Sequence, residues 1–136
     1  MTTLTTTFTK LRAAGACTGG YGKLARHLGG VRAYGAATPI NLLVILESNG
    51  VSDTLWSMRA VKETTERDQV ARLFACGCAE HVLHYFEDKY PNDVRPRQAI
   101  ETARRFAAGA ATIEELAAAG AAAEAAAWAA AWAAGE

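Results

Sequence analysis

The sequence predicts an all-α protein: a single compact domain of six or seven helices, with a long central helix and an alanine-rich C-terminal helix. Apolar residues recur at the i, i+3, i+4, i+7 spacing of a helix in several segments. Capping residues and glycines mark where these segments begin and end, and no segment carries the signal of a β-strand. At 136 residues the chain is long enough to bury one core and too short for two ordinary domains.

Residues 1–62 form the basic N-terminal part of this predicted domain. Thr7 is expected to cap a helix that ends at Gly15, and a second helix is expected from Tyr21 to Leu28. The segment from Val31 to Ala37 is predicted to be a loop. The glycines of this region are interpreted as helix stops, because no strand precedes them and no GxxxxGK[ST] motif of a phosphate-binding loop is present.

A third helix is predicted to begin at Thr38-Pro39, a capping hydroxyl followed by proline at the first helical position. Its residues 42–46 are apolar nearly all round, so we expect this helix to be deeply buried. Ser52 or Asp53 is expected to cap the next helix, which ends near Lys62.

The second part of the predicted domain, residues 63–134, starts with the long central helix, which Thr64 or Thr65 opens and Tyr90-Pro91 ends. Its apolar residues share one broad face, predicted to lie in the middle of the domain: Val70, Phe74, Cys78, His81, Val82 and Tyr85. Four polar residues gather on a narrower strip of the same helix: Gln69, Arg72, Glu80 and Glu87.

Two further helices are predicted after the turn. One restarts at Arg95-Pro96 and ends at Gly109, and Thr112–Glu115 has the pattern of a capping box for the last. The last helix is mostly alanine, the best helix former. Trp128 and Trp132 lie at i, i+4 on one face, where they either dock on the same chain, which we favour, or form a homodimer seam.

The sequence contains no recognisable catalytic set, so we expect a protein that is not an enzyme and has no cofactor. Cys78, His81 and His84 come nearest to a metal site, but a closed zinc site needs four ligands and no second cluster is visible. Cys17, Cys76 and Cys78 are expected to be reduced thiols of a cytoplasmic protein in a bacterial host cell. No apolar stretch is long enough to cross a membrane, and the chain start lacks the apolar region of a secretory signal.

Charge is unevenly distributed along a chain of zero net charge. Residues 1–46 contain five cations and no acid, whereas residues 98–136 contain two arginines and five glutamates. This gradient is compatible with ordinary solvated faces. It also raises an alternative function, contact with nucleic acid or another acidic partner through the basic N-terminal region.

The turn between the central helix and its successor carries both signs of charge and an aromatic ring, in Lys89, Tyr90, Asp93, Arg95 and Arg97. One interpretation is a structural clamp, in which Asp93 caps the next helix or pairs with an arginine. The other is a partner-binding tip, because arginine and tyrosine are typical of interface hot spots.

Three motifs follow one another in the second half of the chain. They are Ala-Cys-x-Cys-Ala-Glu at 75–80, Tyr-Pro-x-Asp-x-Arg-Pro-Arg-x-Ala-Ile-Glu at 90–101, and a glycine followed by an alanine-rich helix with tryptophans. In these motifs, and in the segment 55–61 before them, the chain resembles the immunity-5-like proteins of bacteria and their phages. It departs from the family's pattern at Gly77, where an acid is common, and in its shorter alanine tail.

The resemblance implies an all-α, non-enzymatic cytoplasmic protein with a protein target. The target would be a toxin that the protein neutralises, or a host defence complex that a phage-encoded member inhibits, in either case by covering a site.

Overall fold

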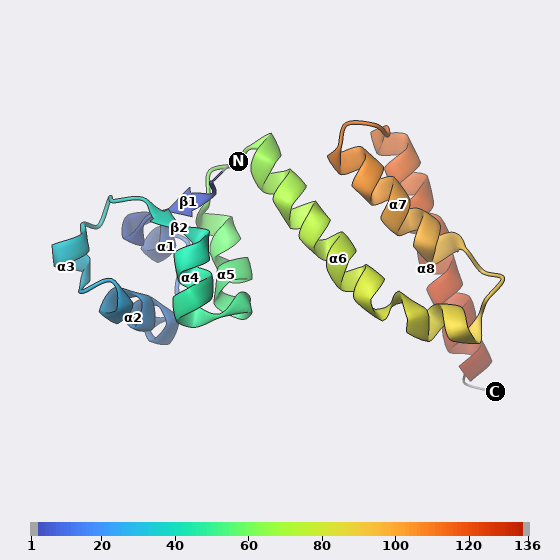
Figure 1. Ribbon diagram of the computed structural model, residues 1–136, viewed down its shortest axis with the longest axis horizontal. Helices are drawn as coiled ribbons and strands as arrows, with labels where there is room; N and C mark the ends of the chain where they lie inside the picture. The colour runs from blue at the N-terminus through green and yellow to red at the C-terminus, as the bar shows by residue number, and fades with distance from the viewer. Residues whose placement is uncertain (1–2, 135–136) are drawn as a thin grey trace. The chain divides into compact units, whose positions relative to one another are not determined.

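The computed structural model describes residues 3–134, and these residues confirm the all-α class (Figure 1). They form eight α-helices, one short 3₁₀ helix and one pair of two-residue strands. The chain divides into two compact units, Met1–Arg67 and Asp68–Glu136, which are described in turn. That the two units form one domain stays a prediction.

The first unit is made of short elements. In chain order they are β1 (Thr5–Thr6), α1 (Phe8–Ala13), α2 (Thr18–His27), α3 (Val31–Tyr34), β2 (Ile40–Asn41), α4 (Leu42–Asn49), α5 (Val51–Ser57) and η1 (Met58–Ala60). The strands pair antiparallel, with Thr5 opposite Asn41 and Thr6 opposite Ile40.

Phe8 lies at the centre of the first unit's core and is completely buried. Its ring makes edge contacts with Tyr21 and Tyr34, at centroid distances of 5.2 and 6.1 Å. The buried Thr6 hydroxyl donates to the carbonyl oxygen of Ala60 at 2.7 Å, which ties β1 to η1. The other buried apolar residues of this core come from five elements and one loop position: Leu11, Leu24, Ile40, Leu42, Ile45, Ala60 and Val61.

The start of the third predicted helix differs from expectation. The Thr38 hydroxyl donates back to the carbonyl oxygen of Tyr34 at 2.9 Å, so it closes α3 and does not cap α4. Asn41 is the cap, since its side-chain oxygen accepts from the Leu43 N–H at 2.9 Å. Pro39 therefore precedes a strand residue, Ile40, and not a first helical turn.

Two other local predictions for this unit are wrong. Val31–Tyr34 is one helical turn and not a loop, because flanking glycines at 30 and 35 adopt positive φ angles and let the chain enter and leave it. Neither Ser52 nor Asp53 caps α5, which begins one residue after Gly50 and is followed by η1 up to Ala60.

Helix α4 is buried on one face and not all round. Leu42 and Ile45 are in the core, whereas Leu43 is 68% exposed and Leu46 is 40% exposed. The reason is length: this helix has eight residues, and the small unit around it covers one side.

The second unit consists of three helices, α6 (Thr65–Lys89, whose first residues belong to the first unit), α7 (Arg95–Ala107) and α8 (Ile113–Ala134). The Thr64 hydroxyl accepts from the Arg67 N–H at 3.1 Å, as expected of the predicted cap. Gly109 ends the second helix with a φ of 74°. The capping box before α8 is also confirmed: the Glu115 carboxylate accepts from the Thr112 N–H, and the Thr112 hydroxyl accepts from the Glu115 N–H.

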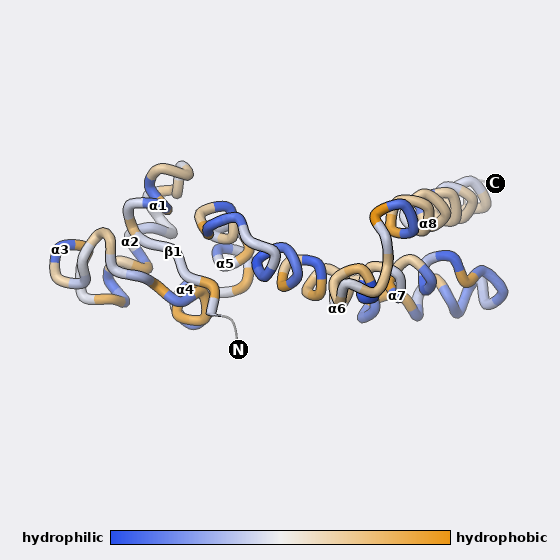
Figure 2. The backbone as a smooth tube through the Cα atoms, turned by 90° about the horizontal axis from the view of Figure 1, so that it is seen from above, coloured by the Kyte–Doolittle hydropathy of each residue, from blue (hydrophilic) through white to orange (hydrophobic). Residues whose placement is uncertain are grey.

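Helices α7 and α8 pack closely side by side (Figure 1). Alanine dominates α8 along its whole length, which Figure 2 shows as an almost uniform pale orange. Ala126 is 1% exposed, and its half-buried neighbours on the same face include Leu116, Ala119 and Ala122. The small side chains let the two backbones approach, so the alanine face itself anchors this helix.

Candidate protein-binding surface

A bidentate ion pair holds the charged turn between α6 and α7 to the first residue of α7. Arg95 donates to both Asp93 carboxylate oxygens, from Nε at 2.8 Å and from Nη2 at 2.6 Å, and its backbone N–H also donates to Asp93. These hydrogen bonds lower the pKa of Asp93 below its usual value, and the carboxylate raises the pKa of Arg95. The pair fixes the turn against the first residues of α7.

A second bidentate pair crosses between the two helices. Arg97 donates to both oxygens of Glu87, with an Nε distance of 2.7 Å. Hydrogen bonding to Arg97 lowers the pKa of Glu87, and Glu87 raises the pKa of Arg97. The last turn of α6 and the first turn of α7 are thereby held together.

The remaining two residues of the turn contact each other and α8. The Lys89 ammonium lies over the Tyr90 ring at 5.6 Å, and the Tyr90 hydroxyl donates to the Ala130 carbonyl at 3.4 Å. Each of the five residues singled out in the sequence thus has a contact within this unit. These are the contacts of a structural clamp, and a role of the turn in partner binding stays a prediction.

We expect low pH to loosen this clamp. Asp93 and Glu87 have folded pKa values below their ordinary 3.8 and 4.5, so their contribution to stability is complete above those values. It is lost as the pH falls through the lower folded values. The thermal midpoint of the second unit should therefore fall between about pH 5 and pH 3, as measured by circular dichroism.

The matched variant for this prediction is Glu87→Gln/Asp93→Asn, which retains the shape of both side chains. Its thermal midpoint should already be reduced at pH 7 and should fall less on acidification. An identical pH profile in wild type and variant would contradict the assignment of the acid-sensitive groups.

The polar strip of α6 faces α7 along the length of both helices. Glu80 accepts from Arg104 Nη2 at 2.6 Å, and Gln69 Nε2 donates to the Ala107 carbonyl at 2.6 Å. Arg72 stacks on the Phe106 ring at 4.8 Å. Long side chains therefore bridge a space between the helices that apolar residues were expected to fill.

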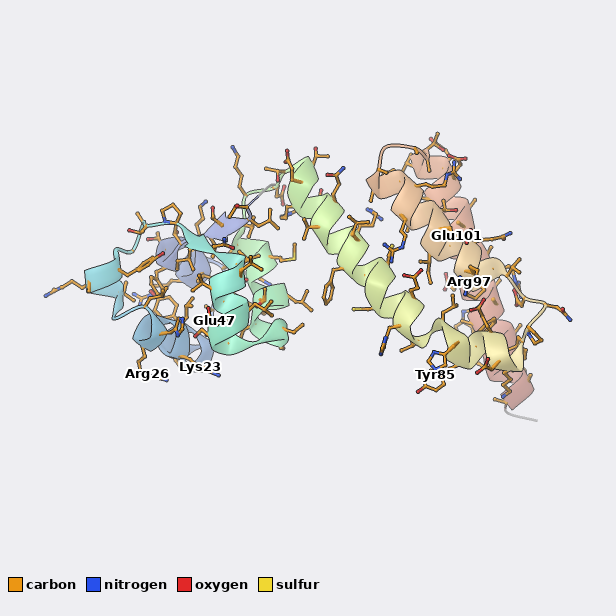
Figure 3. All side chains as sticks on the ribbon, in the orientation of Figure 1. Lys23, Arg26, Glu47, Tyr85, Arg97 and Glu101 are labelled. Carbon is orange, nitrogen blue, oxygen red and sulfur yellow. The ribbon has the colours of Figure 1, made fainter. Side chains whose placement is uncertain are left out.

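The opposite side of α6 is exposed and apolar. We call it the α6 outward face, and it consists of Val70, Phe74, Cys78, Val82 and Tyr85. The exposed fractions of its large residues run from 43% for Phe74 to 73% for Tyr85, whose side chain projects away from α7 (Figure 3). The sequence predicted this face to be buried, and the residues of α6 that are buried are Cys76 and Leu83. An exposed apolar stripe of this length is typical of an interaction surface.

Trp128 and Trp132 are exposed as well, by 63% and 75%. The favoured expectation that they dock on their own chain is therefore wrong. They lie on the side of α8 opposite the buried Ala126, so the same packing that brings alanine against α7 turns both rings outward.

The residues considered for metal binding lie on or beside the exposed side of α6. His84 stacks on Tyr85 with a centroid distance of 4.0 Å, and Cys78 is a free, exposed thiol. No group of three His, Cys, Asp or Glu among residues 3–134 is placed to hold a metal ion. In the same part of the chain, no helix is both long and apolar enough to pass through a bilayer.

Comparison with known families identifies the segment that carries this surface. The family described as Imm-5 like putative immunity protein matches residues 60–134, more than half of the chain. The chain belongs to this family. No curated protein and no solved structure matches this chain.

The Imm-5 like segment contains the whole second unit as described, from the α6 outward face through the clamp to the exposed tryptophans. An immunity protein family implies a protein partner. The sequence motifs located the clamp, and the apolar periodicity of α6 located the outward face but assigned it to the core. The sequence also contained a second signal, for the pairing of α6 with α7. Glu80 and Glu87 are seven residues apart, as are Arg97 and Arg104, and this equal spacing lets two antiparallel helices form two salt bridges.

Proposed function

We propose that this protein is a non-enzymatic, cytoplasmic immunity protein that neutralises another protein, a toxin or a host defence effector, by covering a site on it. The observation that carries the proposal is the α6 outward face, an apolar stripe left exposed by a helix whose polar strip is already bonded to α7. Burial of such a stripe is the main favourable term in protein association.

The clamp contributes a charged rim to this proposed interface. Cys78, Val82, Tyr85 and Lys89 follow one another at helical spacing, so Lys89 continues the outward face into the turn. Apolar centres bordered by charged residues are the usual anatomy of protein interfaces. In this proposal Asp93, Arg95 and Arg97 hold the rim in place through the ion pairs described above.

The test is capture of a protein from lysate of a bacterium that encodes this chain, with three matched variants. Phe74→Ser/Tyr85→Ser alters the outward face, Arg95→Ala/Arg97→Ala breaks the clamp, and Leu43→Ser, exposed in the first unit, serves as the control. We expect wild type and the Leu43 variant to retain one stoichiometric protein and the Phe74/Tyr85 variant to lose it, because a hot-spot residue contributes about 2 kcal/mol or more. Circular dichroism confirms that each variant is folded.

Two outcomes would contradict this assignment. Retention by the Phe74/Tyr85 variant with loss in the clamp variant would move the interface to the turn. No stoichiometric protein partner for wild type would contradict the proposed function. Light scattering of the same preparations gives the mass of the free protein, and a dimer that Trp128→Ala/Trp132→Ala dissociates would show that the tryptophans form a homodimer seam.

Contact with nucleic acid is the second candidate, and the positions of basic residues on α2 favour it. Lys23 and Arg26 are exposed at one edge of the first unit (Figure 3). Retention on DNA or RNA that falls steeply with salt would support this candidate, whereas no retention at about 50 mM salt would exclude it.

A further inference from the structure

The first unit contains a cavity between the α1–α2 turn and the α4–α5 turn. Its volume is about 180 Å³, and its lining includes Leu24 and Ile45 from the core, the rings of Tyr21 and Trp56, and several small residues that leave the space open. An apolar cavity of about 150 Å³ is large enough to hold benzene. The space therefore suits a ligand with a body the size of one aromatic ring.

The Asp53 carboxylate places a hydrogen-bond acceptor on one wall of the cavity. Asn49 Nδ2 donates both to the Gly20 carbonyl at 2.9 Å and to Asp53 Oδ2 at 2.8 Å. Because these two groups accept hydrogen bonds and cannot donate one at these atoms, they fix the orientation of the Asn49 amide. Its oxygen, Oδ1, is buried without a hydrogen-bond partner and is not exposed to the cavity, so Asn49 positions Asp53 and is not itself an acceptor for a ligand. The second carboxylate oxygen of Asp53 likewise accepts no side-chain hydrogen bond among residues 3–134.

Gly20 allows this wall to form. A Cβ atom at that position would lie 2.8 Å from Asp53 Oδ2 and 3.4 Å from Cys17 Sγ, so any other residue would displace the carboxylate. The close approach of α2 to Asp53 keeps an ionisable acceptor at the edge of a space that is lined mainly by apolar groups. Apolar pockets with a few fixed polar groups are the usual form of small-molecule sites.

We propose that this cavity binds a small organic amine, with an apolar body the size of one aromatic ring and one primary ammonium group that donates to Asp53. The ammonium group supplies what the wall lacks, since it has three donors and carries the charge opposite to the carboxylate. The site lies within residues 11–57, outside the Imm-5 like segment, and the proposal does not rest on the proposed immunity function.

Two neighbouring cations make Asp53 decisive for this ligand. The Arg12 guanidinium lies over the Tyr21 ring at 5.2 Å, and that of Arg59 lies over Trp56 at 4.7 Å. Their charge disfavours an ammonium ion in the cavity unless the ion contacts a carboxylate directly. Without the negative charge of Asp53, the cavity should therefore lose its preference for an amine over a neutral ligand of the same shape.

Cys17 provides a direct measure of occupancy, because its exposed thiol lines the cavity. Cys78, also exposed, lies in the second unit and serves as an internal reference. The full chain is treated with iodoacetamide, with and without benzylammonium, and alkylation at each cysteine is followed by mass spectrometry. At about twice the dissociation constant we expect the rate at Cys17 to fall roughly threefold by mass action, with no change at Cys78.

Benzyl alcohol is the matched neutral probe, and Asp53→Asn is the matched variant. In wild type the alcohol should protect Cys17 less than the amine at equal concentration. In the variant, shown to be folded by circular dichroism, the two probes should protect equally. The proposal is overturned if benzylammonium gives no protection, if both probes protect wild type equally, or if the variant keeps the preference for the amine.

Discussion

Replacing Phe8 with alanine should lower the free energy of unfolding of the first unit by about 3–5 kcal/mol. The ring is completely buried and makes edge contacts with two tyrosines, so truncation removes both its apolar surface and two aromatic pairs. A unit of this size has few other large buried side chains to compensate. The total free energy of unfolding of a small domain is about 5–15 kcal/mol, so the expected loss is a large share of it.

The measurement is urea unfolding followed by the fluorescence of Trp56. Substituting Trp128 and Trp132 with phenylalanine leaves Trp56 as the one tryptophan of the chain, so the signal reports the first unit. Leu43→Ala is the control, because this side chain is 68% exposed and its loss should change the free energy of unfolding by no more than about 0.5 kcal/mol. Equal effects of the two substitutions would contradict the position of Phe8 at the centre of the core.

Local signals in the sequence predicted helix boundaries well where one side chain decides them. Thr64 caps α6, the Thr112–Glu115 box caps α8, and Gly15 and Gly109 end helices with positive φ. These features depend on a few adjacent residues and on backbone sterics. The cap of α4 was misassigned because Thr38 and Asn41 are both good capping residues, and tertiary pairing of Ile40 with Thr6 selects the second.

Which face of a helix is covered could not be predicted in the same way. Periodicity places Val70, Phe74 and Tyr85 together and Glu80 and Glu87 together, but it does not identify the neighbour. Helix α7 presents Arg97 and Arg104 to α6, so the acidic side of α6 becomes the one that faces α7. Apolar patterning predicts the buried face only when the neighbouring helix is itself apolar there.

The same reasoning explains why the candidate site was found in part. The clamp was recognised because its charged residues are crowded into nine positions of the sequence. The outward face and the exposed tryptophans were assigned to packing, since a large apolar side chain is most often buried. Each of these helices packs on its own unit through another side. The exposed apolar residues are therefore not needed for packing and indicate a surface that is available to a partner.

Replacing Ala126 with leucine should destabilise the second unit by about 1–3 kcal/mol, with a larger loss if α7 and α8 separate. Ala126 is 1% exposed on α8, a helix that packs closely on α7, and a leucine at so buried a position has no space without a shift of the backbone. Ala125→Leu is the control on the same helix, since Ala125 is exposed and leucine is nearly as good a helix former as alanine. The two variants therefore differ in the direction in which the same added carbon atoms point.

Fluorescence of Trp128 and Trp132 in a Trp56→Phe background reports this unit during urea unfolding. We expect the free energy of unfolding of the Ala126 variant to fall and that of the Ala125 variant to stay within about 0.5 kcal/mol of wild type. The opposite order would place the tryptophan side of α8 against α7 and restore their docking on the chain. The predicted order would confirm that alanine packing turns both rings outward from the second unit, and the proposed homodimer seam depends on that orientation.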